Sequence, residues 1–579
     1  MLAVAFVSFL SLTTTAATSA DRHAAFAGAV SQFLTESEVR DPLFADSIGV
    51  HTQDDRLADM SAAGVASDRA WSAAWRARFA AFDPGTLSID DRADRQRMLD
   101  ALDASALEDQ ALAPAQRDPT TYVGAIGDAA YELTSRDNEP LDVRLRHLAA
   151  RMVLIPGIVK AAEANLTRPP RVATAQAVDD NLGNIDEYQH DVADLAKTAK
   201  PATKAAILDA LPAVLASLND FQHFLSGPLL ARSDGNPRVG AAVFDRELQL
   251  VDGTDTPRAV LVVRAKAEFA ATRARMYALA LPLDKQYFPG KVHHETGDAL
   301  VTAVVGEVLD RLADDHPDRD HIFATAKADV DGLMAFLRRD PVVVLPSPDT
   351  LVVAPTPAFM AGFAGAGLNP AGPFEPLAPS YYYIDRIPDS LTSAQVTSYL
   401  RDHNDYEMQI LSTHEAVPGH YVQFRYNDLI PSLVRRIWTN GSFVEGWAVY
   451  TEGMVEDAGY GGGDPRLRLF QLKWRLREYS NAIIDAEFHT GSLSESQCTS
   501  FLMNDAFQER SQAETKWHRL ELSHDQLSSY FVGYFAIEQA RDAYQQAQGS
   551  HYSLAAFNAR LLAIGSVEPR FITQLIDAH

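Results

Sequence analysis

The sequence has 579 residues, of which 47% are hydrophobic and 22% are charged, a balance typical of a globular protein with a large core and not of a fibrous or disordered one. Its 77 acidic residues outnumber its 51 basic residues and give a formal net charge of -26, which repels phosphate backbones and argues against nucleic-acid binding. Cys498 is the single cysteine, which excludes an intramolecular disulfide and a thiolate-rich metal cluster.

Residues 1–20 are predicted to be a signal peptide. Met1 to Leu12 form an apolar run, and the small residues from Thr13 to Ala20 suit cleavage near Ala20. No other stretch reaches the roughly 20 consecutive apolar residues that a membrane span needs. We therefore expect an exported, periplasmic protein without a transmembrane segment.

Residues 21–240 are predicted to form an N-terminal helical subdomain. Ala- and Leu-rich segments, such as 144–154 and 204–211, repeat hydrophobic residues at helical spacing. Prolines are expected to divide the segment into short helices. These prolines are Pro156, Pro169, Pro170, Pro201 and Pro212. Turn-rich sequence around residues 235–256 predicts a boundary, with a second subdomain over 241–579.

The second subdomain is predicted to be helical around one small sheet. Three short β-branched or aromatic runs, at 341–345, 351–354 and 381–385, predict the strands. Helical spacing precedes these runs and resumes from Thr392. The expected fold class is mainly α (α+β), with two helical subdomains flanking a metal-containing groove and a small β-sheet near the active site.

His414, Glu415 and His420 supply the two imidazoles and the adjacent carboxylate that zinc hydrolases use. In a regular helix, residues six apart point about 240° apart, so both histidines can reach one ion only if the helix breaks between them. Pro418 clashes with the carbonyl four residues earlier, and Gly419 accepts dihedrals that other residues avoid. We predict that this break brings the two imidazoles together; the alternative is a helix end that happens to contain two histidines.

A third ligand is expected from a later helix. Glu445 and Glu452 are seven residues apart in an apolar segment and share one helix face. Burying such carboxylates is costly unless they meet a cation. Glu445 is therefore the predicted ligand, and Glu452 is predicted to hydrogen-bond a ligand histidine. Taken alone, the pair also fits a solvated surface.

Two blocks resemble a known family. His-Glu-Ala-Val-Pro-Gly-His at 414–420 and Glu-Gly-Trp-Ala at 445–448 resemble the bacterial domain-of-unknown-function family 885, which looks related to the gluzincin metallopeptidases. The resemblance continues through 484–489 and 526–533 and covers the C-terminal third of the chain, with departures at 523–526 and at Leu520. It implies one zinc ion on His414, His420 and Glu445, with Glu415 as general base.

The resemblance also suggests roles for four further residues. Residues 529–532 look like the segment that carries the transition-state tyrosine in angiotensin-converting-enzyme-like peptidases, so Tyr530 is expected to donate to the oxyanion. Asp485 precedes His489 by four residues and can orient its ring, which makes His489 a candidate second donor. Arg519 is expected to bind a peptide carboxylate. The alternatives are a helix aromatic, a structural hydrogen bond and a surface salt bridge, respectively.

We predict a zinc-dependent peptidase that hydrolyses short peptides, in which Glu415 takes a proton from the attacking water and returns it to the leaving amine. Two alternatives remain open. One is a zinc amidase acting on a non-peptide or cell-envelope amide, and the other is a non-catalytic exported binding protein. The expected partner is a short peptide or amide substrate, and the sequence carries no signal for an oligomeric state.

Overall fold

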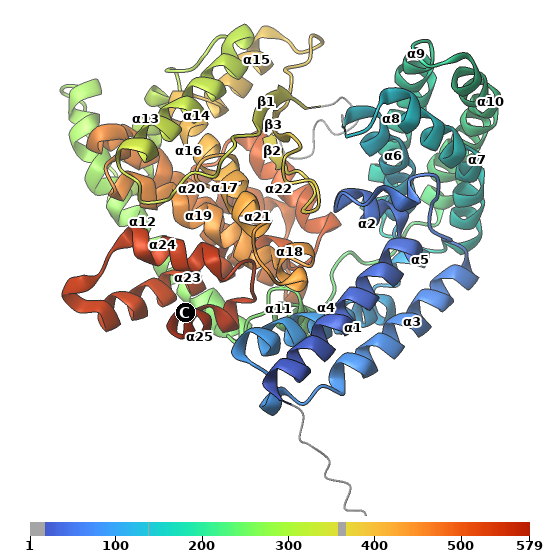
Figure 1. Cartoon of the computed structure of the whole chain (residues 1–579). Coiled ribbons are helices and arrows are strands. Elements are labelled where there is room, and N and C mark those ends of the chain that lie inside the picture. Colours follow the sequence, from blue (N-terminus) through green and yellow to red (C-terminus); the bar gives the residue numbers. More distant parts are fainter. Residues whose placement is uncertain (1–17, 137, 357–365) are drawn as a thin grey trace, which may run out of the picture.

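The computed structural model describes residues 18–136, 138–356 and 366–579. The predicted signal peptide falls almost entirely outside these residues. Figure 1 shows two helical lobes, one blue to teal and the other green to red, with the sheet on the side of the second lobe that faces the first. The predicted fold class, mainly α with a small β-sheet, is confirmed, because the described residues are mainly helical and form a three-stranded sheet.

The N-terminal lobe contains two separate hydrophobic cores. Its helices are α1 (Ser19–Arg40), α2 (Pro42–Ser47), α3 (Ala62–Ala80), α4 (Ile89–Ala111), α5 (Pro114–Arg117), α6 (Thr120–Ser135), α7 (Leu141–Asn165), α8 (Arg171–Asp186), α9 (Ala193–Ala196) and α10 (Pro201–Phe224). One core joins Phe33, Trp75 and Met98 to Val434 of the C-terminal lobe. The other contains buried residues between positions 122 and 229. The first helices therefore connect the lobes, and the later ones form a bundle of their own.

Two prolines do not divide helices as the sequence had suggested. Pro156 lies inside α7, and Pro212 lies inside α10. Pro212 is exposed and Pro156 is half-buried, so water can reach the carbonyl groups that lose their helical partners. Buried residues on both sides of each proline hold the two halves of the helix in line. Pro201, in contrast, begins a helix as expected.

One helical stretch of the described chain, Pro201–Leu229, is long and apolar enough to cross a membrane. Ile207, Val214 and Phe221 on this stretch are fully buried in the second N-terminal core. A core helix of a globular protein meets the same length and composition criterion, so this stretch is weak evidence for a membrane span.

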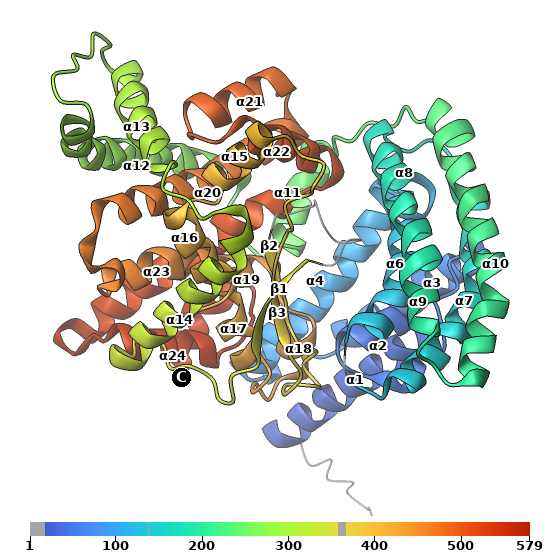
Figure 2. The same cartoon turned by 90° about the horizontal axis from the view of Figure 1, so that it is seen from above.

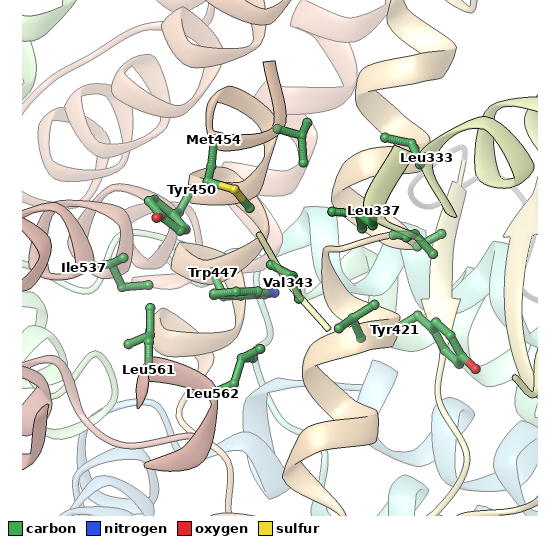
Figure 3. Close-up of a cluster of buried hydrophobic side chains, with 14 of the residues drawn as sticks. Leu333, Leu337, Val343, Tyr421, Trp447, Tyr450, Met454, Ile537, Leu561 and Leu562 are labelled. Carbon is green, nitrogen blue, oxygen red and sulfur yellow. The ribbon is translucent and has the colours of Figure 1, made fainter. Parts of the chain in front are cut away.

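The C-terminal lobe is built around one central helix, α19. The helices of this lobe are α11 (Ala241–Leu250), α12 (Arg258–Tyr287), α13 (Asp298–Leu312), α14 (Ile322–Arg339), α15 (Ser393–Asp402), α16 (Asp405–Glu415), α17 (His420–Asn427), α18 (Leu433–Ile437), α19 (Gly441–Asp457), α20 (Pro465–Thr490), α21 (Glu495–Asn504), α22 (Arg510–Leu522), α23 (Gln526–Gln548), α24 (Leu554–Ala563) and α25 (Ile572–Ala578). Figure 3 shows Trp447 of α19 among Tyr421 of α17, Ile537 of α23 and Leu561 of α24. This packing fixes α19 relative to its neighbours.

The sheet has the strand order β1-β3-β2, so that β2 is an edge strand. Its strands are β1 (Leu351–Pro355), β2 (Ala366–Asn369) and β3 (Ser380–Ile384), with β1 parallel and β2 antiparallel to β3. The runs at 351–354 and 381–385 predicted β1 and β3, whereas β2 was not predicted. Figure 2 shows the sheet at the face of the C-terminal lobe that is turned toward α6.

The strand predicted at residues 341–345 is absent, because the structure gives this segment an irregular conformation. Side chains from two helices satisfy its backbone carbonyl groups instead of a neighbouring strand. Asn558 Nδ2 donates to Val342 O over 3.0 Å, and Tyr426 Oη donates to Val344 O over 2.9 Å. Val343 is buried in the core between them. The apolar run is thus a core-packing segment and not a strand.

Candidate metal centre

The helix break predicted between the two histidines is present. Helix α16 ends at Glu415, and α17 begins at His420. A Cβ atom on Gly419 would lie 1.8 Å from His414 O, so glycine is needed for this close approach of two backbone segments. The break brings the ring of His414 to the ring of His420, with centroids 4.8 Å apart and planes at 87°.

Trp447 of α19 holds the break in place. Its indole Nε1 donates to Pro418 O over 2.9 Å and approaches Gly419 O at 3.3 Å, and its side chain is fully buried. Trp447 lies two residues after Glu445 on the same helix. The helix that carries Glu445 therefore also fixes the backbone between the two histidines, which the sequence did not predict.

Three side-chain atoms converge in front of this break. Glu445 Oε2 lies 3.5 Å from His414 Nε2 and 3.6 Å from His420 Nε2, and it has no hydrogen-bond partner. Two ligands of a tetrahedral zinc ion, each at about 2.1 Å, are separated by about 3.4 Å. Both histidines are buried. The spacing and the unpaired carboxylate oxygen fit a metal ion with two nitrogen ligands and one oxygen ligand.

The electrostatics of this group favour a cation. Burial opposes protonation of His414, but the carboxylates of Glu445 and Glu452 raise its pKa well above the usual value. Burial opposes ionisation of Glu445, but the two histidines lower its pKa. Negative charge is thus available at the point where the imidazoles meet, as a divalent metal ion would require.

A second carboxylate lies behind His414. Glu452 is fully buried, and its Oε1 lies 2.8 Å from His414 Nδ1, as expected for a residue that orients a ligand histidine. Glu478 of α20 is also buried. His414, Glu452 and Glu478 each have a side-chain nitrogen or oxygen atom within 4.8 Å of those of the other two. Burial and the neighbouring Glu452 raise the pKa of Glu478 well above its usual value. Glu478 was not predicted from the sequence, where its only signal was a carboxylate on an otherwise buried helix face.

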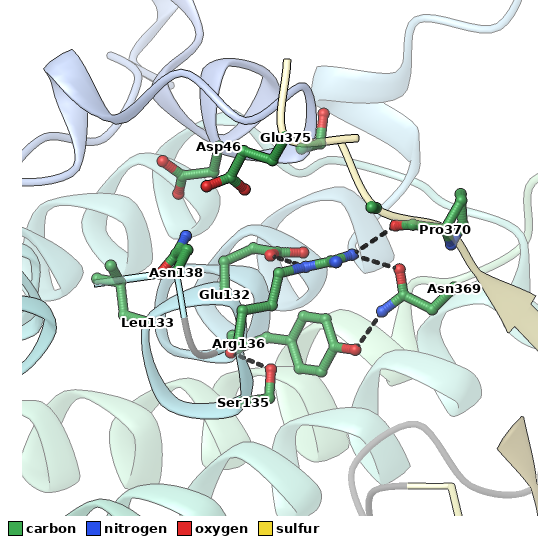
Figure 4. A network of polar contacts seen from close by, with 12 residues as sticks. Asp46, Glu132, Leu133, Ser135, Arg136, Asn138, Asn369, Pro370 and Glu375 are labelled. Carbon is green, nitrogen blue, oxygen red and sulfur yellow. Dashed lines mark hydrogen bonds and ion pairs between the residues drawn. The ribbon is translucent and has the colours of Figure 1, made fainter. Parts of the chain in front are cut away.

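The edge strand β2 orients the predicted base. The backbone N–H of Leu368 donates to Glu415 Oε2 over 3.1 Å. Figure 4 shows how the N-terminal lobe holds this strand, with Arg136, which directly follows α6, donating to Asn369 Oδ1 over 2.6 Å and to Pro370 O over 2.9 Å. Asn369 in turn donates to the hydroxyl of Tyr131. Both lobes therefore contribute to the position of the Glu415 carboxylate.

Helices α22 and α23 bring two further predicted residues to the centre. The ring of Tyr530 stacks on His414 with centroids 6.4 Å apart, and Arg519 Nη2 donates to Tyr530 Oη over 3.3 Å. Lys516 lies one helical turn before Arg519 and is 6% exposed. Its burial, together with Arg477 and Arg519, lowers its pKa well below the usual value. Lys516 was not predicted from the sequence, although its spacing of three residues from Arg519 places both side chains on one helix face.

His489 and Asp485 lie elsewhere. His489 is buried and stacks on Phe244, and no hydrogen bond, ion pair or ring contact among the described residues joins it to the three converging side chains. Glu478 precedes it by eleven residues on α20, about 16 Å along the helix axis. Asp485 accepts hydrogen bonds from the N–H and hydroxyl of Ser528 at 2.9 and 2.8 Å. It therefore caps the first turn of α23. Its Oδ1 also lies 3.5 Å from His489 Nε2, so the predicted proximity of these two residues is present, but no contact among the described residues supports a role for His489 as an oxyanion donor.

The sequence matches a known protein family over most of its length. Residues 42–576 match the family model described as bacterial protein of unknown function, DUF885. The chain belongs to this family. No curated protein matches it. The match to DUF885 spans nearly the whole sequence, so it includes the N-terminal lobe as well as the two histidines at positions 414 and 420.

Two solved structures are similar to this chain over nearly its whole length. A predicted lipoprotein of unknown function from Shewanella oneidensis is 28% identical, with a TM-score of 0.80, and the match covers 97% of this chain and 100% of that one. A predicted lipoprotein from Colwellia psychrerythraea is 16% identical with a TM-score of 0.79, covering 97% and 99% of the two chains. At 16% identity the second shows a shared fold alone.

Proposed function

We propose that this DUF885 protein is a zinc-dependent peptidase acting on short peptides, related to the gluzincins. The observation that carries the proposal is that Glu445 Oε2 lies within 3.6 Å of both His414 Nε2 and His420 Nε2, beside the Glu415 carboxylate. A zinc ion bound there would polarise the substrate carbonyl and lower the pKa of a bound water. This three-ligand set is the kind that catalytic zinc sites use, because it leaves a fourth position open.

The protein's own groups supply the proton transfers. One oxygen of Glu415 accepts the Leu368 N–H, which leaves the other oxygen to take the proton of the attacking water and to deliver it to the leaving amine. The hydroxyl of Tyr530 donates to the oxyanion that forms on the carbonyl oxygen. Arg519 binds the same hydroxyl and keeps it beside His414.

The surroundings favour a short peptide with a free carboxylate. Arg519 of α22 lies beside Tyr530, and a guanidinium binds a carboxylate with two parallel hydrogen bonds. A cavity of about 330 Å³ opens between the lobes beside Leu368 and Tyr131. Such a cavity accommodates side chains of a peptide that lies along β2. We propose exopeptidase action on this basis.

We further propose that the protein is exported to the periplasm. The apolar N-terminal run predicts a signal peptide, and the two structural relatives are predicted lipoproteins. Lipoproteins are exported proteins, so the comparison agrees with the N-terminal sequence. Periplasmic peptides and cell-envelope amides are the substrates available in that compartment.

The decisive experiment is Glu415→Gln, which keeps the shape of the side chain and removes the base. Turnover of a short-peptide library by the zinc-loaded protein should fall about 10²- to 10⁴-fold, while zinc content measured by atomic absorption is retained. Glu163→Gln on the exposed face of α7 is the control. Unchanged turnover would refute the assignment of the base. Cleavage of envelope amides without cleavage of peptides would favour the amidase alternative.

A further inference from the structure

A second cavity lies behind the metal centre. It has a volume of about 460 Å³ and is lined by α12, α19, α20 and α23. At 100° per residue, Tyr450 and Asp457 lie on the face of α19 opposite Glu445 and Glu452. The cavity therefore opens on the side of this helix away from Glu445 and Glu452, and only Arg475 of its lining reaches toward the candidate metal centre, with its Nε 3.4 Å from Glu478 Oε2. No function proposed above uses this cavity.

Arginine dominates the polar lining of this cavity. Its arginines are Arg264, Arg275, Arg468, Arg475 and Arg541. The lining also contains four carboxylates, two of which already form ion pairs with lining arginines. Asp457 pairs with Arg468 and Glu538 pairs with Arg541, each at 2.6 Å. The lining thus has one more cation than anions, in a chain whose formal net charge is -26.

Aromatic rings hold two of the guanidinium groups flat. The guanidinium of Arg475 lies 3.8 Å from the ring centroid of Tyr534, and that of Arg264 lies 4.5 Å from the ring centroid of Phe535. Stacking on a ring face leaves the N–H groups at the guanidinium edge free to bind in the plane. A planar fork of N–H donors matches the two oxygens of a carboxylate, phosphate or sulfate group.

Several of these guanidinium N–H groups make no hydrogen bond within the described chain. Arg475 is 5% exposed and forms an ion pair with Glu478, whose Oε2 lies 3.4 Å from its Nε, but this Nε makes no hydrogen bond. Its Nη2 donates to Val449 O over 2.8 Å. Arg275 and Arg264 make neither a hydrogen bond nor an ion pair with any described residue. A buried guanidinium with an unpaired N–H is costly, so the cavity has donors in place for an anion.

We propose that this cavity is a binding site for the oxyanion group of a small ligand, held by Arg475, Arg264 and Arg275. The buried Arg475 forms the floor, and the two exposed arginines of α12 close over the ligand from the rim. Tyr450 and Tyr479 line the walls and provide apolar surface for the remainder of the ligand. The chemistry specifies an oxyanion, and the two probes below distinguish a carboxylate from a tetrahedral anion.

The test is isothermal titration of the full chain with sulfate and with acetate, against chloride at the same ionic strength. Saturable binding of sulfate or acetate, with a Kd of about 1 mM or tighter, is expected. Arg264→Gln and Arg275→Gln should each weaken it about tenfold or more, because each removes charge-assisted hydrogen bonds. Both positions are exposed, so both variants should fold. Arg338→Gln, on the exposed face of α14, is the matched control and should bind like the wild type.

Two results would refute the proposed oxyanion-binding site. One is the lack of saturable binding of either oxyanion, and the other is binding that Arg264→Gln and Arg275→Gln leave unchanged. The Glu415→Gln variant should bind the oxyanion as the wild type does. If the peptidase proposal fails, the oxyanion titration is unaffected. If oxyanion binding fails, the turnover test of Glu415→Gln is unaffected.

Discussion

Gly446 of α19 and Gly533 of α23 lie in direct backbone contact. A Cβ atom on Gly446 would come within 2.3 Å of the carbonyl carbon of Gly533, and one on Gly533 would come within 1.6 Å of Ser442 O. Glu445 directly precedes the first glycine, and Tyr530 precedes the second by three residues. This helix crossing therefore sets the distance between the candidate metal ligand and the candidate oxyanion donor.

Gly533→Ala should destabilise the protein, because its methyl group has no space at the crossing. Overpacking of this kind costs about 1–3 kcal/mol, or more where backbone must move. Urea denaturation followed by circular dichroism measures the loss. Gly28→Ala in α1 is the control, since nothing lies within 4 Å of its Cβ position; it should stabilise the fold by about 0.4–1 kcal/mol. If the two variants are equally stable, the close backbone contact between α19 and α23 at Gly533 is refuted.

Glu452→Gln should weaken zinc binding about 10- to 100-fold, because the carboxylate that orients His414 is replaced by an amide. Competition with a chelating dye measures the affinity. Glu456→Gln, four residues later on the same helix, removes a carboxylate that pairs with Arg468 and should leave zinc affinity unchanged. If both variants bind zinc like the wild type, Glu452 has no role in holding His414 for the metal.

Arg519→Gln should raise the KM for peptides with a free C-terminal carboxylate about tenfold or more, through loss of charge-assisted hydrogen bonds. The same peptides with an amidated C-terminus should show a much smaller change. Steady-state kinetics on matched peptide pairs provides the comparison. Arg510→Gln at the exposed start of α22 is the control. If the KM rises equally for both members of each pair, Arg519 acts only through its hydrogen bond to Tyr530 and does not bind the substrate carboxylate.

His489 should make stability fall in acid. Burial lowers its pKa from 6.5 to about 3. Between these values the unfolded chain binds a proton that the folded chain does not, so stability is present above pH 6.5 and declines as pH falls, by up to about 1.4 kcal/mol per pH unit. His489→Gln should flatten this dependence in urea titrations across the window, whereas exposed His190→Gln should not. Parallel pH profiles for wild type and His489→Gln would contradict the assignment.

The sequence predicted which residues converge at the candidate metal centre, but it did not predict which distant segments hold them in place. His414, His420, Glu445 and Glu452 were chosen by residue type and spacing, and the structure brings them together. The spacing of six residues indicated a break because helix geometry is fixed. For Gly419, however, the reason is steric, since a Cβ would strike the carbonyl of His414.

Contacts between distant segments were beyond sequence reasoning. The hydrogen bond from Leu368 to Glu415 depends on an edge strand with little β-propensity. Trp447 reaches the carbonyl groups at the break across 29 and 28 residues. His489 had the right spacing from Asp485, but nothing in that spacing revealed that His489 packs against Phe244 and that Asp485 binds Ser528.

By itself the sequence determined the mainly helical fold class, the helix break and the residue types of a two-histidine, one-carboxylate site, because backbone periodicity and proline sterics act within a few residues. The tertiary structure decided which carboxylates stand behind His414, which strand holds Glu415 and where the unpaired arginines gather. Those features depend on which helix faces pack together, and packing depends on side chains hundreds of residues apart.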